Sequence, residues 1–476
     1  MRVLFLIHDV ITIPLGITYI ASILQKRGHE PGALTIRDPE LDRRVKDWNP
    51  DVIAFGCTTG FHRQYFSVAR RLKDQHPDIP IIAGGAHATF FPEDFDRNPF
   101  IDYMIMGEAD TAVTQMVEAI EGSRPFPDVG NLIRRDSGRT VRNAMLPLVE
   151  DLDTIPFPKR DILVGYRPST ADRAAFCITG RGCPYSCTYC FNHSLKKLYS
   201  GLGTYVRRRS VDNVIGELVE LRDASPALQM IVFQDDTFVL GHDWVREFCE
   251  RYPSEVGLPF HCHVRANHLT PGIAKVIAKA GCLSVKMAVE TTDDRARNDI
   301  LGRNMDMETI RGACRSLKDA GIRFVTQNIL CIPTCSFEDD VRTMSFNSEM
   351  RPDFTFATLL QPYPGTEIAR FCKENGFIDS AAEAPETPDS FFHASVLDIP
   401  DRKRRERLRA LFALSVEFPI LMKLAGFLTR LPLGGLYSFM DKIWKGYCIK
   451  QRIFPYRLTA AEYARDVISY FRSNYY

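Results

Sequence analysis

Three cysteines stand close together near the middle of the chain, in the sequence Cys183-Pro-Tyr-Ser-Cys187-Thr-Tyr-Cys190. Thiolates are soft ligands that bind zinc and iron–sulfur clusters. Three of them on so short a loop can surround one small inorganic cluster. A four-iron cluster held by three cysteines keeps one iron without a protein ligand, just as a catalytic zinc ion keeps an open position. The motif therefore predicts a [4Fe-4S] site whose open iron binds a substrate.

A zinc knuckle is the alternative for the same loop, with His193 as its fourth ligand. We favour the iron–sulfur cluster because a spacing of three and then two residues between cysteines is unusual for zinc. The remaining cysteines do not suggest a disulfide scaffold, since the chain has thirteen in 476 residues and the number is odd. We expect the other ten to be structural thiols.

The elements that must position this motif alternate between short apolar runs and helical patterns over residues 172–385. The cysteine motif follows the first run. Six strand–helix units predict a partial (β/α)6 barrel of the TIM type, whose active site lies where the strands end in loops. The expected strands are residues 175–179, 230–233, 260–264, 284–289, 324–329 and 354–360.

The first 125 residues show the same alternation and predict a Rossmann-like, flavodoxin-like α/β domain with a parallel sheet. Thr58 and Thr59 follow one expected strand, and Gly84 and Gly85 end another. In open α/β sheets, ligands bind beyond these carboxyl ends. Residues 126–171, rich in proline and charge, predict a linker. Residues 386–476 predict a mostly helical C-terminal segment.

The cysteine motif, its place after the first strand and the barrel series resemble the radical S-adenosylmethionine (SAM) enzymes. The resemblance implies that Cys183, Cys187 and Cys190 ligate a [4Fe-4S] cluster whose open iron chelates the amino and carboxylate groups of SAM. It also implies that an electron, delivered by an external reductant such as flavodoxin or ferredoxin, cleaves SAM to methionine and a 5′-deoxyadenosyl radical. That radical removes a hydrogen atom from the substrate.

Further residues match this family strand by strand. The resemblance implies that Tyr189 packs on the adenine of SAM, that Asp235 or Asp236 contacts the amino group, and that Glu290 accepts from the ribose hydroxyls. Arg265 is placed to meet a carboxylate. The alternatives are a helix N-cap for the two aspartates and a salt bridge at the barrel rim for Arg265.

The fifth strand departs from the family pattern. Relatives commonly read Gly-x-Pro-Gly-Glu-Thr, whereas this chain has Cys331-Ile-Pro-Thr-Cys335-Ser336. Two cysteines make a poor site for a second cluster, so we expect Cys331 and Cys335 to be buried thiols.

The N-terminal domain resembles the cobalamin-binding domain that precedes the barrel in one large radical SAM class. The matching stretches are residues 14–29, 84–92 and 102–108. The resemblance implies a cobalamin cofactor, with Thr58, Thr59, Gly84 and Gly85 as candidate contacts. The chain has no Asp-x-His-x-x-Gly sequence, so we expect base-off cobalamin without a histidine ligand from that motif. A flavodoxin-like domain without a cofactor is the alternative.

The near-neutral net charge of +1 conceals a basic C-terminal segment. Residues 401–476 hold fifteen Lys and Arg against six Asp and Glu, among apolar and aromatic residues. Such a segment is either a helical cap with a solvated basic face or a surface that contacts an anionic membrane or an apolar substrate. No nucleic-acid-binding module is visible, and no apolar run reaches the ~18 residues of a membrane span. We expect a cytoplasmic protein, with peripheral contact at the inner membrane face as the alternative.

These features predict a cobalamin-dependent radical SAM methyltransferase that acts on a small molecule, with an apolar one as an option. In this scheme the methyl group of methylcobalamin is transferred to an unactivated carbon after hydrogen abstraction. One alternative is an oxidase or cyclase that uses the same cofactors without methyl transfer. The other is a sensor that binds cobalamin or SAM without turnover.

Overall fold

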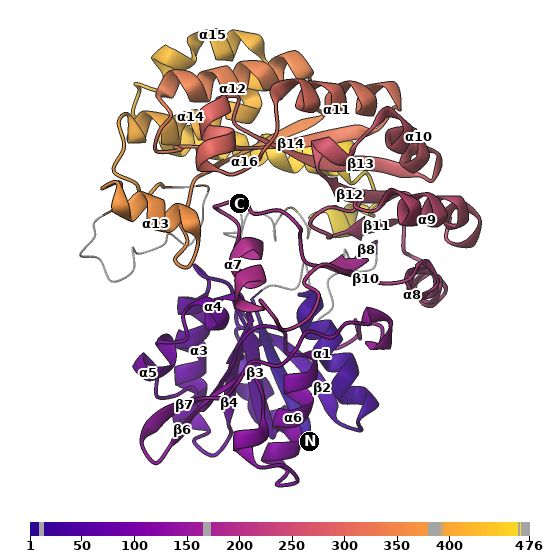
Figure 1. Cartoon of the computed structure of the whole chain (residues 1–476), viewed down its shortest axis with the longest axis vertical. Helices are drawn as coiled ribbons and strands as arrows, with labels where there is room; N and C mark the ends of the chain where they lie inside the picture. The colour runs from indigo at the N-terminus through magenta and orange to yellow at the C-terminus, as the bar shows by residue number, and fades with distance from the viewer. Residues whose placement is uncertain (9–13, 165–172, 379–391, 393, 465–466, 468–476) are drawn as a thin grey trace. The chain divides into compact units, whose positions relative to one another are not determined.

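The computed structural model describes residues 1–8, 14–164, 173–378, 392, 394–464 and 467 (Figure 1). The chain forms two compact units. The first contains Met1–Ala171 and Leu195–Arg209, and the second contains Asp172–Ser194 and Ser210–Tyr476.

The first unit is built on a seven-stranded sheet in the order β2-β1-β3-β4-β5-β6-β7. Its first five strands in this order are parallel, and 2-1-3-4-5 is the flavodoxin-like order, as predicted. These strands are β1 (Arg2–Ile7), β2 (Glu30–Thr35), β3 (Val52–Gly56), β4 (Ile81–Gly84) and β5 (Tyr103–Ile105). The helices are α1 (Leu15–Lys26), α2 (Leu41–Trp48), α3 (His62–Gln75), α4 (Gly85–Phe90), α5 (Asp94–Arg97) and α6 (Asp110–Ile120).

Helices cover both faces of this sheet because both faces of its strands are apolar. In β1, Leu4 and Leu6 pack in one core with α2 and α3, while Phe5 and Ile7 pack in another with α1 and α6. Successive side chains of a strand point to opposite faces, so an uninterrupted apolar run fills two cores.

The expected linker is not structureless. Within residues 126–171, β6 (Leu132–Asp136) and β7 (Arg139–Arg142) form a hairpin, and β6 pairs antiparallel with β5. Asp136 through Arg139 make the tight turn, and Ser137 and Gly138 both have positive φ angles. The hairpin was missed because β7 is polar and half exposed, so its pattern does not alternate clearly.

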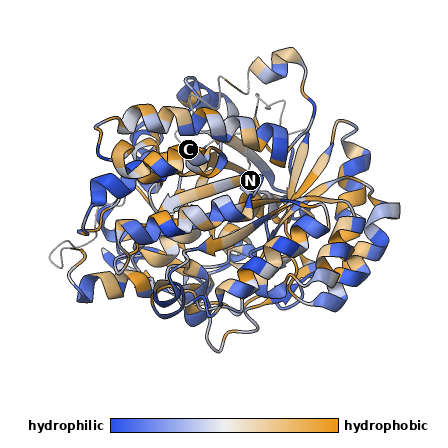
Figure 2. Cartoon of the chain, turned by 90° about the horizontal axis from the view of Figure 1, so that it is seen from above, coloured by the Kyte–Doolittle hydropathy of each residue, from blue (hydrophilic) through white to orange (hydrophobic). Residues whose placement is uncertain are grey.

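The second unit contains six parallel strands in sequence order, which confirms the predicted open βα barrel. They are β8 (Ala174–Cys177), β11 (Met230–Phe233), β12 (Phe260–Val264), β13 (Cys282–Glu290), β14 (Arg323–Leu330) and β15 (Phe354–Leu359). The helices that follow them are α8 (Val211–Ala224), α9 (His242–Glu255), α10 (Pro271–Lys279), α11 (Met307–Asp319), α12 (Phe337–Met350) and α13 (Glu367–Glu374). In Figure 2 the strands are mostly hydrophobic, while many helices carry both colours.

Alternation along β13 assigns the two faces of this sheet. Val285, Met287 and Val289 are fully buried in the core that contains the helices. Lys286 and Ala288 therefore face the opposite, inner side. The inner side of β12 carries His263 by the same argument.

Three C-terminal helices complete the second unit: α14 (Arg402–Glu417), α15 (Pro419–Leu428) and α16 (Gly434–Cys448). The basic run at the start of α14 does not simply form a solvated face. Arg405 is fully buried in an ion pair with Asp340, and Arg409 is buried against Asp441. The sequence suggested that this basic face is solvated. Instead, the charges of Arg405 and Arg409 attach α14 to its neighbours.

The sequence predicts one crossing between the two units, at the linker, whereas the chain makes two further crossings. It leaves the second unit after Ser194, contributes residues 195–209 to the first unit, and returns at Ser210. In the first unit Tyr199 accepts a hydrogen bond from the Glu108 backbone (2.6 Å), and Arg207 pairs with the Glu108 carboxylate. A Cβ at Gly107 would lie 2.0 Å from the Tyr199 hydroxyl, so only glycine fits there.

Candidate functional site

The three motif cysteines lie on the loop between β9 (Gly180–Arg181) and α7 (Phe191–Leu198). Cys187 is buried, and Cys183 and Cys190 are partly exposed. Burial raises the pKa of the Cys183 thiol, and that of Cys190 to about 11. Without a bound metal, these two thiols stay protonated at neutral pH. A metal centre is therefore needed to stabilise their thiolate form. Three soft donors on one loop fit an iron–sulfur cluster.

Thr188, between the second and third cysteines, anchors this loop. Its backbone N–H donates to Leu301 and its hydroxyl donates to Ile300, while its carbonyl accepts from Ile368. Gly302 has φ of +63°, and a Cβ there would lie 3.2 Å from the Ser186 carbonyl oxygen. The barrel thus holds the cysteine loop from two sides.

Tyr189 and Glu290 meet directly. The Tyr189 hydroxyl donates to Glu290 Oε1 at 2.6 Å, and the Arg303 guanidinium lies 3.7 Å from the same oxygen. Glu290 ends β13 at a register shift, with φ of +67°. Burial raises the pKa of Glu290, while Arg303 and Tyr189 oppose that rise. Oε2 makes no hydrogen bond within the described residues, so one carboxylate oxygen remains for a ligand.

Asp235 and Asp236 have different roles in the structure. Both oxygens of Asp235 accept from the backbone N–H of Thr179 (2.9 and 3.1 Å), and one also accepts from its hydroxyl. Asp235 therefore holds the connection that leads to the cysteine loop. Asp236 is exposed, accepts from Asn192, and its charge raises the pKa of Cys183 and Cys190. Of the two aspartates, Asp236 is therefore the one that presents a carboxylate beside the cysteines.

Arg265 faces the cysteine loop rather than solvent. Its guanidinium donates to Cys187 Sγ at 3.7 Å, donates to the Arg303 carbonyl, and lies 3.6 Å from the centre of the Tyr185 ring. The Arg265 side chain makes no ion pair with a carboxylate of the described residues. The salt bridge at the barrel rim, which was the alternative role for Arg265, is therefore not formed among them. Its Nε atom is buried without a hydrogen-bond partner.

Cys331 and Cys335 are buried, as the sequence analysis expected. Cys331 has φ of +62°, where relatives commonly have glycine. The Cys335 carbonyl accepts from Arg405 at 2.8 Å. Burial raises the pKa of both thiols, that of Cys335 to about 12, which leaves them poor nucleophiles and poor ligands.

In the first unit, the two glycines at the end of β4 differ. Gly85 has φ of +86°, and a Cβ there would lie 2.9 Å from backbone atoms of Cys57, so the protein itself requires this glycine. At Gly84 the nearest atom would be 3.7 Å away, and the fold alone would accept a side chain. Thr58 is exposed beside them, and the Thr59 hydroxyl lies 3.2 Å from His87 Nδ1.

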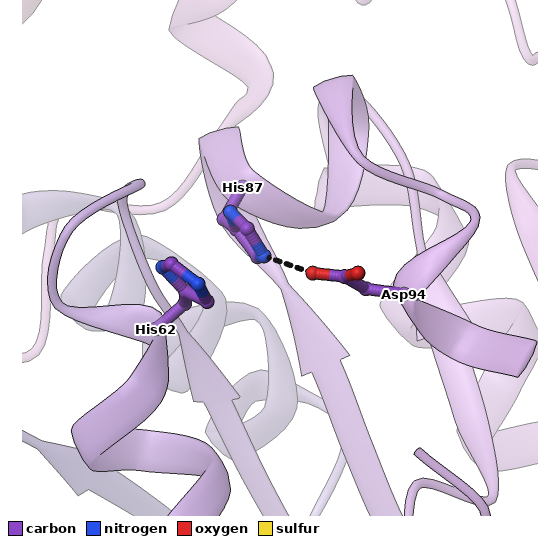
Figure 3. Close-up of side chains that lie close together, drawn as sticks. All are labelled: His62, His87 and Asp94. Carbon is purple, nitrogen blue, oxygen red and sulfur yellow. Dashed lines mark hydrogen bonds and ion pairs between the residues drawn. The ribbon is translucent and has the colours of Figure 1, made fainter. Parts of the chain in front are cut away.

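Two histidines and an aspartate gather at the same edge of this sheet (Figure 3). His87 Nε2 lies 2.9 Å from an Asp94 oxygen, and the rings of His62 and His87 stack with their centres 3.9 Å apart. His62 Nδ1 accepts from the Gly60 N–H. Burial lowers the pKa of His62 to about 4, with His87 adding to the effect, so His62 is neutral at neutral pH.

The ligand atoms of these three side chains lie within 4.8 Å of one another, a spacing that could hold a metal ion. The ring orientation argues against it. An imidazole binds a metal in its own plane, and the two planes differ by only 14°, one above the other. One ion cannot lie in both planes. The arrangement is a hydrogen-bonded stack in which Thr59 and Asp94 occupy both nitrogens of His87.

Lys286 is the other unexpected polar residue. It is half-buried on the inner side of β13, beside His263 in register, and it has no ion pair with any described residue. Its ammonium lies 6.0 Å from the Phe356 ring centre. Burial lowers the pKa of Lys286 to about 8 and that of His263 well below its usual value.

Two family models match this chain. One, described as "B12 binding domain", matches residues 2–117, and the other, "Radical SAM superfamily", matches residues 177–346. The chain is a radical SAM protein with a B12-binding domain. The first match covers β1 to β5 and most of α6, and the second begins shortly before the cysteine loop.

Relatives of this radical SAM protein match over both units. An uncharacterized methyltransferase of Pyrococcus horikoshii is 26% identical, over 77% of this chain and 79% of its own. The cytidylyl-2-hydroxyethylphosphonate methyltransferase of Streptomyces wedmorensis is 24% identical, over 78% and 80%. Further relatives include anaerobic magnesium-protoporphyrin IX monomethyl ester cyclases.

The solved structure of the radical SAM methyltransferase TsrM from Kitasatospora setae, with tryptophan and a SAM analogue bound, has the same fold. Its TM-score is 0.68 at 16% identity, over 81% of this chain and 80% of that one. This likeness supports the architecture of the radical SAM protein and says nothing of its substrate.

The structure also adds residues that sequence reasoning missed. Arg303 follows no recognisable motif and reaches Glu290 only through the fold. His62 and His87 were not among the candidate residues, although His87 lies in the stretch 84–92 that carried the resemblance. Lys286 lies in the run that ends at Glu290, and its inward orientation follows from the alternation of that run.

Proposed function

We propose that this protein is a cobalamin-dependent radical SAM methyltransferase that transfers a methyl group to an unactivated carbon. The observation that carries the proposal is the combination of two features on one chain. One is the B12-binding domain, and the other is the three-cysteine loop, beside which Tyr189 and Glu290 are hydrogen-bonded to each other. The methyltransferases among its relatives support the same reaction class.

Cys183, Cys187 and Cys190 would hold a [4Fe-4S] cluster, which when bound supplies the electron that cleaves SAM, while cobalamin carries the methyl group. The protein supplies the surroundings. Arg265 donates to Cys187 Sγ and so helps to position that sulfur within the loop. Thr188 fixes the loop to the barrel, and this keeps the geometry of the three thiols constant.

Each of several residues around the loop would recognise a different part of SAM. Asp236 presents an exposed carboxylate to the SAM ammonium group, and Glu290 Oε2 accepts from the ribose hydroxyls. Arg303 helps to keep Glu290 ionised despite burial. The Tyr189 ring, held by its hydrogen bond to Glu290, packs on the adenine. Asp235 acts as a positioning residue, because both its oxygens hold Thr179.

Cobalamin would lie at the carboxyl edge of the first sheet, against Thr58, Thr59, Gly84 and Gly85. Gly84 supports this placement, because the fold itself does not require a glycine there. We propose base-off cobalamin without a histidine ligand. His87 cannot serve as one because both its nitrogens are engaged.

The substrate is a small molecule, and we propose that Lys286 and Phe356 contact it from the inner side of the barrel. A half-buried ammonium with no acidic partner among the described residues favours a substrate with an anionic or carbonyl group, and the aromatic ring favours an apolar part. An external one-electron donor such as flavodoxin or ferredoxin, a cytoplasmic location and peripheral membrane contact complete the proposal.

The experiment that tests the reaction class needs no substrate. Protein reconstituted anaerobically with iron, sulfide and hydroxocobalamin is incubated with SAM and a reductant, and the products of SAM are separated by mass spectrometry. A methyltransferase should form S-adenosylhomocysteine as well as 5′-deoxyadenosine. Neither product should form with the Cys183→Ala, Cys187→Ala, Cys190→Ala variant. Absence of both from the wild type would contradict the proposal and favour a sensor.

An oxidase or cyclase is the second candidate, favoured by the cyclases among the relatives. In the same experiment it should form 5′-deoxyadenosine without S-adenosylhomocysteine, because no methyl group leaves SAM. With a substrate identified, a product heavier by one CH2 would support methylation, and loss of hydrogen would support cyclisation.

A further inference from the structure

Exposed apolar side chains are concentrated on one part of the second unit. Thirteen large hydrophobic side chains are exposed among the described residues, and ten of them lie between Phe418 and Tyr447. These ten, which we call the apolar face, are Phe418, Ile420, Leu424, Phe427, Leu433, Leu436, Phe439, Met440, Ile443 and Tyr447. Ile420 and Phe427 are more than 60% exposed.

The spacing of these residues puts them on one side of each helix. In α16, Phe439, Met440, Ile443 and Tyr447 lie three, four, seven and eleven residues after Leu436, a spacing that places all five on one side of the helix. Tyr437 and Cys448, on the other side, are buried. The same holds for α15, where Ala425 is buried and Ile420, Leu424 and Phe427 are exposed. Both helices are therefore amphipathic, and their apolar sides are exposed.

The size of this face exceeds what a protein usually leaves in water. Ten half-exposed side chains of this size present on the order of 800 Å² of apolar surface, compared with roughly 300–600 Å² for the largest patch of a typical monomer. α15 lies at the outer edge of the second unit in Figure 1. A partner must cover such a surface.

The charges around the apolar face indicate which partner. Lys423 and Arg430 are the exposed charged residues between Phe418 and Tyr447, and both are positive. The segment has one acidic residue, Asp441, which is paired with Arg409. In a symmetric dimer through this face, the cations would meet without an acid opposite them. Anionic lipid headgroups supply the missing negative charge.

Helix length and aromatic residues agree with a membrane surface. The 15 residues of α16 extend ~22 Å, less than the ~30 Å of a hydrocarbon core. No helix in the described ranges is long and apolar enough to cross a bilayer. Trp444 packs against Phe418 and Tyr447 at one end of the face, with ring centres 5.5 Å away in each case. Such amphipathic aromatics favour the headgroup level of a bilayer.

We propose that α15 and α16 form a membrane-docking surface that lies flat on an anionic bilayer, with the apolar face inserted at the headgroup boundary and Lys423 and Arg430 on the lipid phosphates. This surface specifies the membrane contact of the proposed function. It needs no cofactor, so it can fail without affecting the proposed chemistry.

Vesicle co-sedimentation of the full chain tests the proposal. The wild type should sediment with mixed phosphatidylcholine–phosphatidylglycerol vesicles, and binding should fall about tenfold when phosphatidylcholine is used alone. The Phe427→Gln, Phe439→Gln variant should lose about tenfold in partition onto the anionic vesicles. The matched control is Leu198→Gln with Tyr463→Gln, which removes two exposed hydrophobic residues elsewhere and should bind like the wild type.

Three results would overturn the proposal. The first is wild-type protein that stays in solution with anionic vesicles at low salt. The second is equal loss of binding in the control and the test variant. The third is a dimer in sedimentation velocity that the Phe427→Gln, Phe439→Gln variant converts to a monomer, since a second copy would then cover the face. Formation of 5′-deoxyadenosine should be the same in both variants, which shows that they are folded.

Discussion

The buried ion pair between Arg405 on α14 and Asp340 on α12 should dominate the attachment of the C-terminal helices. Arg405 Nε lies 2.6 Å and Nη2 3.1 Å from the two carboxylate oxygens, and Nη1 donates to the Cys335 carbonyl at 2.8 Å. Both side chains are at most 3% exposed. Burial raises the pKa of Asp340 even with Arg405 against it, so the pair offsets only part of its desolvation cost.

Replacing Arg405 alone should therefore be severe. Arg405→Met leaves the Asp340 carboxylate buried without a counter-charge, which costs about 3–5 kcal/mol of unfolding free energy. Arg405→Met combined with Asp340→Leu removes both charges and should cost only about 1–2 kcal/mol, for the donor that the Cys335 carbonyl loses. The matched control is Lys403→Met, two residues earlier in α14 and 69% exposed, which should change stability by less than about 0.5 kcal/mol.

Urea unfolding followed by tryptophan fluorescence measures these differences, because Trp444 reports on the C-terminal helices. The order of stability should be Lys403→Met, then the double variant, then Arg405→Met. The reasoning is refuted if Arg405→Met is no less stable than Lys403→Met, or if the double variant is less stable than Arg405→Met. Either result would mean that the unpaired carboxylate is not what the arginine compensates.

Four further predictions concern the sites. Asp236→Asn should weaken SAM binding about tenfold at unchanged melting temperature, whereas Asp235→Asn should lower the melting temperature; calorimetric titration and thermal melts separate the two. His261 has its pKa lowered by burial to about 3, against ~6.5 when unfolded, so the unfolded state alone gains a proton as pH falls from ~6.5 toward 3. Stability should fall over that window by up to ~1.4 kcal/mol per pH unit, and a His261→Gln variant with the same pH dependence would contradict this. Lys286→Met should abolish product formation while 5′-deoxyadenosine still forms; unchanged substrate turnover would exclude the contact. The paramagnetic resonance spectrum of the cob(II)alamin form should lack nitrogen superhyperfine splitting, and splitting that disappears in His62→Phe would identify an unexpected ligand.

The fold was predictable where one periodicity dominates. The strands 230–233 and 260–264 were placed at their observed bounds because they are short apolar runs between clear helices. The hairpin at 132–142 was missed because polar edge strands lack that signal. The segment 195–209 was missed for another reason: the contact between Tyr199 and Glu108 joins residues 91 positions apart, and no local pattern encodes it.

The candidate site was predictable in residue type and less so in role. The sequence identified Asp235 and Asp236 as a pair, and only the geometry shows that Asp235 is occupied by Thr179 while Asp236 is exposed. Arg303 carried no motif at all. The basic run at the start of α14 was predicted to be solvated because its own sequence does not show that an acidic partner lies on another helix. Asp340 on α12 is that partner for Arg405.

The interleaving of the two units affects how this chain can be made. During synthesis the first unit has its whole sheet once Arg142 has emerged, but the residues that close its Gly107–Glu108 turn are 57 to 65 positions further along, beyond the cysteine loop of the second unit. A chain stopped at residue 171 would therefore lack Tyr199 and Arg207 and would leave the end of β5 uncovered. A barrel begun at residue 172 would carry residues 195–209 with nothing to pack against. The two halves of this protein cannot be exchanged with those of a relative by a single cut.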